Sequence, residues 1–91
     1  MDEIKNFGWA LEMLKDGLKV CRSGWNGKGM WLVLVAGQVA PVQPDSVYAK
    51  GGKSEVVINP HIDMMTATGE MQPGWLASQT DMLAEDWEIV E

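Results

Sequence analysis

The chain has 91 residues, a formal net charge of −6 and one cysteine. This length predicts a single compact domain spanning residues 1–91, with no room for a second core. Thirteen acidic residues against seven basic ones argue against a protein that grips a DNA or RNA backbone, because such proteins usually present a positive face. A single cysteine excludes an intrachain disulfide and a cysteine-based zinc site.

Apolar residues make up 46% of the chain and include five tryptophans. The interior of so small a domain is limited, so we expect some apolar side chains in a pocket or against another subunit. Any one tryptophan could equally be a core residue. The sequence shows no signal peptide, and the longest apolar run, Met30–Ala36, is too short to span a bilayer. The predicted location is therefore the cytoplasm.

The first predicted element is a helix from Phe7 to Asp16. Asn6 suits its N-cap, and Gly17 suits its C-terminal stop. Five apolar residues follow helical spacing along one face: Phe7, Ala10, Leu11, Leu14 and Leu18. We expect this face to pack on the core.

The remaining elements are predicted to be strands and turns. Alternating polarity predicts a strand over Leu18–Arg22, and aromatic and β-branched residues predict a central strand over Met30–Ala36. Prolines and glycines indicate a loop over Gly37–Lys53. Further strands are predicted at Ser54–Asn59, His61–Thr66, Glu70–Gln72 and Trp87–Val90, with a tight turn at Thr68-Gly69 and a short helical turn from Ser78 to Leu83. The predicted fold is α+β, with one N-terminal helix packed on a small antiparallel sheet in a single domain.

The sequence contains no recognisable catalytic set. His61, the only histidine, lies two residues before Asp63, so the two side chains would share one face of a strand. No nucleophile motif, zinc-protease motif or Walker loop accompanies them. We therefore favour a structural pair and predict no catalytic residue, no metal ligand and no cofactor. The acidic cluster Asp81, Glu85 and Asp86 could bind a cation, although a solvated helix face is the commoner meaning.

The glycine-studded loop Ser23–Gly29 is the first candidate binding segment. Its glycines let the backbone approach a ligand and present amide N–H groups to an anion. Trp25 offers a flat face for stacking on a base, and Asn26 an amide that can read a base or ribose edge. Lys28 and the preceding Arg22 bring positive charge near a phosphate. The alternative is a flexible turn with an incidental tryptophan.

The second candidate segment is Pro73–Met82. Trp75 follows a Pro-Gly break, where a large aromatic side chain is costly unless it packs or binds something. Four hydrogen-bonding side chains then begin a helical turn: Ser78, Gln79, Thr80 and Asp81. A helix N-terminus favours an anion, whereas Asp81 suits ribose hydroxyls better than phosphate. Two such loops, from one subunit or from two, would be enough for an aromatic sandwich around a purine.

The strings FGWALEMLKDGLKVCRSGWNGKGMWL and PHIDMMTATGEMQPGWLASQTDMLAEDWEIV closely resemble the second Thoeris anti-defence family of bacteriophages. Proteins of that family are sponges that sequester cyclic ADP-ribose isomers made by bacterial TIR-domain immune proteins. The resemblance covers both ends of the chain, and W-N-G-K-G-M and W-L-A-S-Q-T-D-M-L-A-E-D-W are its most distinctive strings. The middle, Gly37–Lys53, is the least family-like part.

The resemblance implies a homotetramer of small α+β subunits with ligand pockets between protomers. It also implies stacking of the adenine between aromatic residues and polar contacts to ribose and phosphate, at positions that here are Trp25, Asn26, Trp75, Thr80 and Asp81. The implied function is sequestration, without cleavage, of cyclic ADP-ribose-type signals such as glycocyclic ADP-ribose in the cytoplasm of the infected host. The implied partners are the nucleotide and further copies of the chain, with no DNA, RNA or membrane. Some relatives also bind cyclic oligonucleotide signals, at a surface that the sequence does not place.

Two other functions remain compatible with the sequence. A small protein-interaction module would present its tryptophans to a protein partner. A cyclic-nucleotide hydrolase would use His61 or Asp63. Neither the preferred isomer nor the subunits that share a pocket follow from the sequence.

Overall fold

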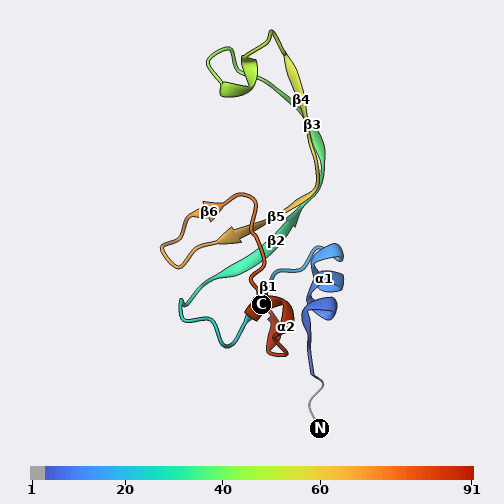
Figure 1. The fold of residues 1–91 in the computed structure, drawn as a ribbon, viewed down its shortest axis with the longest axis vertical. Helices are drawn as coiled ribbons and strands as arrows, with labels where there is room; N and C mark the ends of the chain where they lie inside the picture. Colours follow the sequence, from blue (N-terminus) through green and yellow to red (C-terminus); the bar gives the residue numbers. More distant parts are fainter. Residues whose placement is uncertain (1–3) are drawn as a thin grey trace.

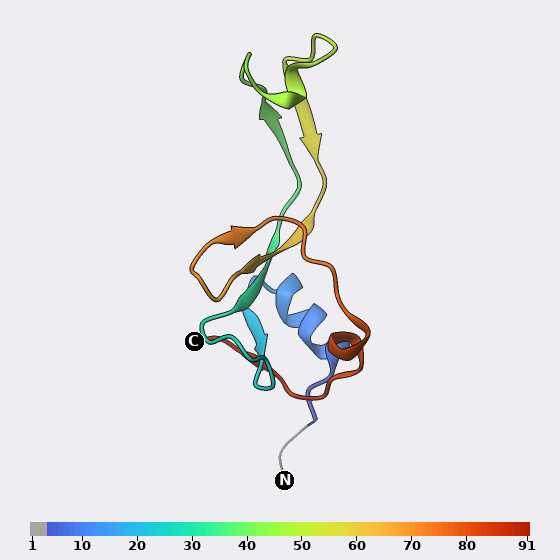
Figure 2. The ribbon, with the colours of Figure 1, turned by 60° about the vertical axis from the view of Figure 1, so that its left-hand side comes forward.

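A single long helix, α1 (Phe7–Lys15), packs on a five-stranded antiparallel sheet in the computed structural model, which describes residues 4–91 (Figures 1 and 2). The strand order is β6-β5-β2-β1-β7, so β2 is central, as the sequence predicts. The strands are β1 (Val20–Arg22), β2 (Trp31–Val35), β5 (His61–Met65), β6 (Met71–Gln72) and β7 (Trp87–Ile89). The predicted α+β fold is confirmed.

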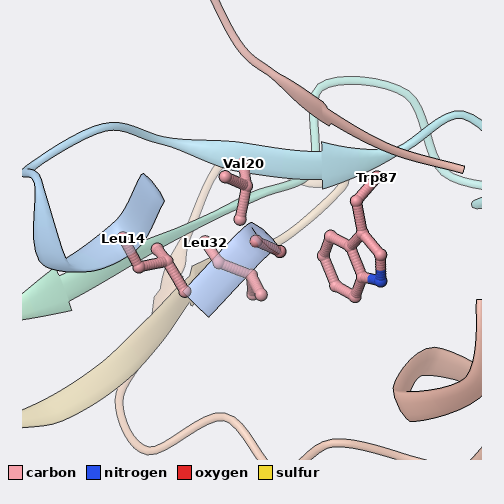
Figure 3. Close-up of a cluster of buried hydrophobic side chains, with 5 residues drawn as sticks. Leu14, Val20, Leu32 and Trp87 are labelled. Carbon is pink, nitrogen blue, oxygen red and sulfur yellow. The ribbon is translucent and has the colours of Figure 1, made fainter. Parts of the chain in front are cut away.

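The core lies between α1 and the sheet. Asn6 caps the helix as predicted, because its side chain accepts a hydrogen bond of 2.9 Å from the backbone N–H of Trp9. Gly17 follows the helix with φ +87°, a conformation that favours glycine. The fully buried side chains are Ala10, Leu14, Val20, Leu32 and Trp87 (Figure 3). The amphipathic pattern thus predicted the buried positions Ala10 and Leu14 correctly. It was wrong for Leu18, which lies beyond the end of the helix and is exposed.

The prediction of a loop throughout Gly37–Lys53 is wrong. This stretch contains β3 (Gln38–Pro41) and a 3-10 turn, η1 (Val47–Ala49), and β3 pairs with β4 (Glu55–Ile58). Together they form a two-stranded arm, residues 38–58, that extends away from the rest of the molecule, which we call the body (Figures 1 and 2). Pro41 ends β3, where its missing N–H leaves the rest of the ladder intact.

The arm makes the molecule long. Its extents are 57 × 25 × 25 Å and its radius of gyration is 16.0 Å, against about 12 Å for a compact chain of this size. The sequence predicted a compact domain because composition carries no information about how far a hairpin extends from the core.

The C-terminal half follows its predicted pattern closely. The predicted strands appear as β4 to β7, the Thr68-Gly69 turn joins β5 to β6, and α2 (Gln79–Leu83) begins after Ser78. The Ser78 hydroxyl accepts a hydrogen bond of 3.1 Å from the N–H of Asp81, as a cap should. No helix in residues 4–91 is both long and apolar enough to cross a membrane.

Exposed apolar side chains are numerous, but they are not the tryptophans. All five tryptophans are buried or half-buried. The most exposed large apolar residues, each at least 60% exposed, are Ile4, Val39, Val47, Tyr48, Val57, Leu76 and Leu83. Four of these seven lie on the arm, so much of the expected apolar surplus lies far from the core.

Candidate ligand-binding site

Trp25 sits in the loop between β1 and β2, and several contacts hold it against the body. Its indole Nε1 donates a hydrogen bond of 3.0 Å to Asp81 Oδ1. Its ring meets that of Trp87 edge-on, with centroids 5.5 Å apart. The preceding Gly24 donates its backbone N–H to Asp86 Oδ2 at 2.8 Å. Trp25 is therefore held at a defined position rather than carried by a flexible turn.

Trp75 sits in the segment between β6 and α2 and packs on the same core. Its ring lies 6.2 Å from that of Phe7 and 6.4 Å from that of Trp87, centroid to centroid. Its backbone N–H donates to the carbonyl of Ile62 at 2.6 Å, and Gly74 donates its N–H to Asp63 Oδ1 at 2.8 Å. Hydrogen bonds thus hold the segment of Trp75 to β5, and they hold the segment of Trp25 to the residue just before β7.

The buried ring of Trp87 joins the two tryptophans within one chain. Trp87 is 1% exposed, lies beside Val20 and Leu32 in the core (Figure 3), and donates its Nε1 to the backbone carbonyl of Asp81 at 3.2 Å. Trp25 and Trp75 are only half-buried, so the core does not fully enclose either residue. Fifty residues of sequence separate these two side chains, and the fold brings both to one aromatic cluster.

Arg22 binds two carboxylates beside this cluster. Its Nη1 donates to Asp81 Oδ1 at 2.8 Å, its Nε donates to Asp86 Oδ1 at 2.8 Å, and its Nη2 donates to Asp86 Oδ2 at 3.4 Å. The side chains of Arg22 and Asp81 are each 13% exposed. Two negative charges on one cation leave the network with a net charge of about −1. Asp81 and Arg22, both predicted site residues, therefore contact each other.

The network shifts the pKa of each member toward its charged form. Hydrogen bonds that Arg22 donates to Asp86, and then to Asp81, raise the pKa of Arg22. The hydrogen bond from Arg22 is the main cause of the lowered pKa of Asp86. Burial alone would raise the pKa of Asp81, but hydrogen bonds from Trp25, Arg22 and Ser78 together lower it. All three groups are charged at neutral pH.

Three predicted site residues lie in the same two segments with exposed side chains. Asn26 and Lys28 follow Trp25 in its loop, and Thr80 is in the first turn of α2, next to Asp81. Their exposure leaves amide, ammonium and hydroxyl groups free to meet a ligand beside the tryptophans.

The possible catalytic groups form structural contacts. His61 Nδ1 lies 2.8 Å from the carbonyl of Asn59, and its Nε2 lies 3.3 Å from Asp63 Oδ1. The thiol of Cys21 is half-buried against Glu88, and burial, followed by that carboxylate, raises its pKa to about 11. Such a thiol stays protonated at neutral pH and is a poor nucleophile. Within residues 4–91 no three His, Cys, Asp or Glu side chains are grouped to hold a metal.

Sequence reasoning missed the roles of Asp63, Asp86 and Trp87 at this site. Asp86 was predicted to belong to a solvated acidic face, yet it binds Arg22 and Gly24. Trp87 was assigned only to a strand. The Gly-Trp pairs at residues 24–25 and 74–75 were the available signal, but the carboxylates that hold them lie 62 and 11 residues away in the chain, a pairing that no local pattern predicts.

The fold and this cluster define a small α+β protein in which two half-buried tryptophans pack on the ring of Trp87, beside two aspartates that bind Arg22. Residues 5–90 match the family described as the Thoeris anti-defense 2-like domain. A protein of Bacillus phage SP01 named Thoeris anti-defense 2 is 44% identical over 86 residues, which cover 93% of each chain. The chain therefore belongs to the Thoeris anti-defense 2-like family, a family of anti-defence proteins. The resemblance recognised in the sequence is confirmed.

Proposed function

We propose that the protein is a phage sponge that binds cyclic ADP-ribose-type signalling nucleotides, such as glycocyclic ADP-ribose made by TIR-domain immune proteins, and sequesters them without cleavage in the cytoplasm of the infected bacterium. The family places the protein in Thoeris anti-defence. The observation that carries the finer proposal is the convergence of Trp25, Trp75 and Asp81, three residues predicted to contact the ligand, around the ring of Trp87.

The cluster offers the chemistry that a cyclic adenine nucleotide needs. The indoles of the two half-buried tryptophans supply π-faces on which an adenine can stack. The carboxylate of Asp81 is charged and can accept hydrogen bonds from ribose hydroxyls. Asn26 and Thr80 add exposed polar groups on either segment.

We assign the phosphate-facing charge to Lys28 rather than to Arg22. The guanidinium of Arg22 already binds Asp81 and Asp86, and the resulting network carries excess negative charge. A phosphate placed there would be repelled, whereas Lys28 is exposed and adjoins loop amides that can face an anion. Arg22 then serves to hold the two carboxylates in place.

Self-association completes the proposal, with a homotetramer as the expected assembly. A two-stranded hairpin is marginally stable alone in water, yet the arm projects from the body and exposes Val39 and Val57, which lie opposite each other on its surface. Covering these side chains with another copy would stabilise the arm. A site shared between subunits would also enclose a small ligand more completely.

Isothermal titration calorimetry of the purified protein against cyclic ADP-ribose isomers, combined with mass-resolved sizing, tests the proposal. We expect tight binding, with fewer sites than protomers. Ligand released by heating should have the mass of the intact cyclic nucleotide, because capture without turnover consumes nothing. Linear ADP-ribose in that fraction would instead identify a hydrolase.

The remaining alternative is a module that presents its tryptophans to a protein. In that case no isomer would bind a correctly folded oligomer, and Trp25→Ala and Trp75→Ala would leave the calorimetric trace flat, as in the unmodified protein. The proposed function would then be wrong.

A further inference from the structure

One local arrangement occurs twice in the body. In each copy a glycine precedes a half-buried tryptophan, and the glycine N–H donates to a carboxylate held on a different element. Gly24 donates to Asp86 Oδ2 and Gly74 donates to Asp63 Oδ1, both at 2.8 Å. The two segments have no common sequence beyond Gly-Trp. The feature they share is this hydrogen bond from the glycine N–H to a distant carboxylate, which we call the Gly–Asp tie.

A side chain at either glycine would disturb this arrangement. A Cβ atom on Gly24 would lie 2.6 Å from Asp86 Oδ2, so the carboxylate that accepts the Gly24 N–H would have to move. Gly74 has φ +74°, a conformation that other residues rarely adopt. The backbone at each position is therefore shaped to bring its N–H to a carboxylate just before the tryptophan.

The two carboxylates are themselves fixed. Asp63 lies within β5, opposite Val33 of the central strand β2, and its neighbour Ile62 accepts the N–H of Trp75. Asp86 immediately precedes β7 and is held by two donors of Arg22. Hydrogen bonds to a charged acceptor are stronger than neutral ones, so each tie anchors a loop to a rigid part of the sheet.

We propose that Asp63 and Asp86 are positioning residues, which do not touch the ligand but fix Trp75 and Trp25 in the orientation that the nucleotide meets. The proposal rests on the proposed function, since it explains how that site is pre-organised. A loop already ordered in the free protein loses less conformational freedom when the ligand binds. Neither aspartate was among the residues predicted to contact the nucleotide.

The first test is a double-mutant cycle between Asp63 and Trp75, measured by calorimetry with the tightest-binding cyclic ADP-ribose isomer. We expect Asp63→Ala to weaken binding about tenfold. If Asp63 acts through Trp75, the double variant will bind no more weakly than Trp75→Ala alone. The losses of affinity from Asp63→Ala and Trp25→Ala should instead multiply when the two are combined. Equal losses in both backgrounds would contradict the proposal.

Conservative and neighbouring variants separate the tie from other roles of Asp63. Asp63→Asn keeps an oxygen that can accept the Gly74 N–H, so affinity should stay within about threefold of the unmodified protein. His61→Ala removes the other contact of Asp63 and should leave affinity unchanged. Asp45→Ala, an exposed carboxylate of the arm, is the matched control for loss of one negative charge. If Asp63→Asn binds as weakly as Asp63→Ala, charge rather than position is responsible.

A measurement on the ligand-free protein tests the positioning roles independently of which nucleotide binds. Protein labelled with 5-fluorotryptophan gives one fluorine resonance for each tryptophan. The resonance that disappears in Trp25→Phe or in Trp75→Phe is thereby assigned to that residue. Asp63→Ala should shift or broaden the Trp75 resonance and spare that of Trp25, and Asp86→Ala should do the reverse. Unmoved resonances in folded variants would overturn the positioning roles. Selective shifts without calorimetric binding would instead leave the positioning intact and overturn the proposed function.

Discussion

The body of this protein is stabilised by buried side chains, whereas the arm buries few of its own. Among residues 4–91, the five fully buried side chains all lie in the body, two in α1 and three in the sheet. The arm pairs β3 only with β4, and its valines at residues 39 and 57 are 62% and 73% exposed. A hairpin stabilised mainly by its own backbone hydrogen bonds would be marginal, so the body must supply the stability of the fold and the arm must have another use.

The largest expected effect contrasts buried and exposed side chains directly. Leu32→Ala removes a fully buried side chain from the central strand and should lower the free energy of unfolding by about 2–5 kcal/mol. Val57→Ala in the arm should change it by less than about 0.5 kcal/mol, because that side chain buries little within the subunit. Urea unfolding at one fixed protein concentration measures both, since self-association would otherwise alter the apparent stability. Similar losses for the two variants would mean that the arm contributes to the core.

The next effect concerns ligand binding at the aromatic cluster around Trp87. Trp75→Ala should weaken nucleotide binding by about 1–3 kcal/mol, roughly ten- to a hundredfold, through lost stacking. Calorimetry gives the affinity, and a melting curve of the same variant shows whether the fold survives. Trp9→Ala is a useful comparison, since Trp9 is half-buried on α1 and outside the proposed site. If Trp75→Ala loses its cooperative melting transition, Trp75 is chiefly a core residue.

A charge on the arm should separate subunits while sparing the body. Val57→Asp places a carboxylate on the exposed face that also carries Val39, so the dissociation constant for self-association should rise at least tenfold, about 1.4 kcal/mol. Sedimentation over a concentration series measures it. Glu55→Gln, which changes a charge two residues earlier on the same exposed face of β4, is the matched control. An unchanged assembly in Val57→Asp would show that the arm lies outside the subunit contact.

Sequence patterns predicted the body well because its elements bury one face against the core. The spacing of Ala10 and Leu14 identified the buried side of α1, and the apolar run around Leu32 identified the central strand. In the arm the same reasoning predicted β4, whose residues alternate between exposed and half-buried, but it missed β3. Three of the four residues of β3 are exposed, so its burial gives little alternation to detect, and Pro41 and Pro44 indicate a loop.

In the candidate site too, some features were predicted from local sequence and others were not. Trp25 and Trp75 were found from local sequence because a tryptophan in a polar, glycine-containing loop is unusual. Their common contact with Trp87, and the binding of Arg22 to two aspartates, depend on strand pairing across the sheet, which β1 and β7 establish over more than 60 residues. Candidate site residues can be predicted from local sequence, but the residues they contact follow only from the strand topology.

The smallest expected effect is a pH dependence confined to the carboxylate network of the body. Asp81 and Asp86 have pKa values below the ordinary 3.8 in the folded protein. Their stabilisation is therefore present above that value and is lost as the pH falls through it toward the lowered native pKa. Carbon-detected NMR titration of the side-chain carboxyls measures both groups directly. In Arg22→Met both pKa values should rise, that of Asp86 more because Arg22 is the main cause of its shift, and acid unfolding should become less steep. If the two carboxyls titrate alike with and without Arg22, the ion pairs seen beside Trp25 do not persist in solution, and the loop would then depend on the aromatic contact with Trp87 alone.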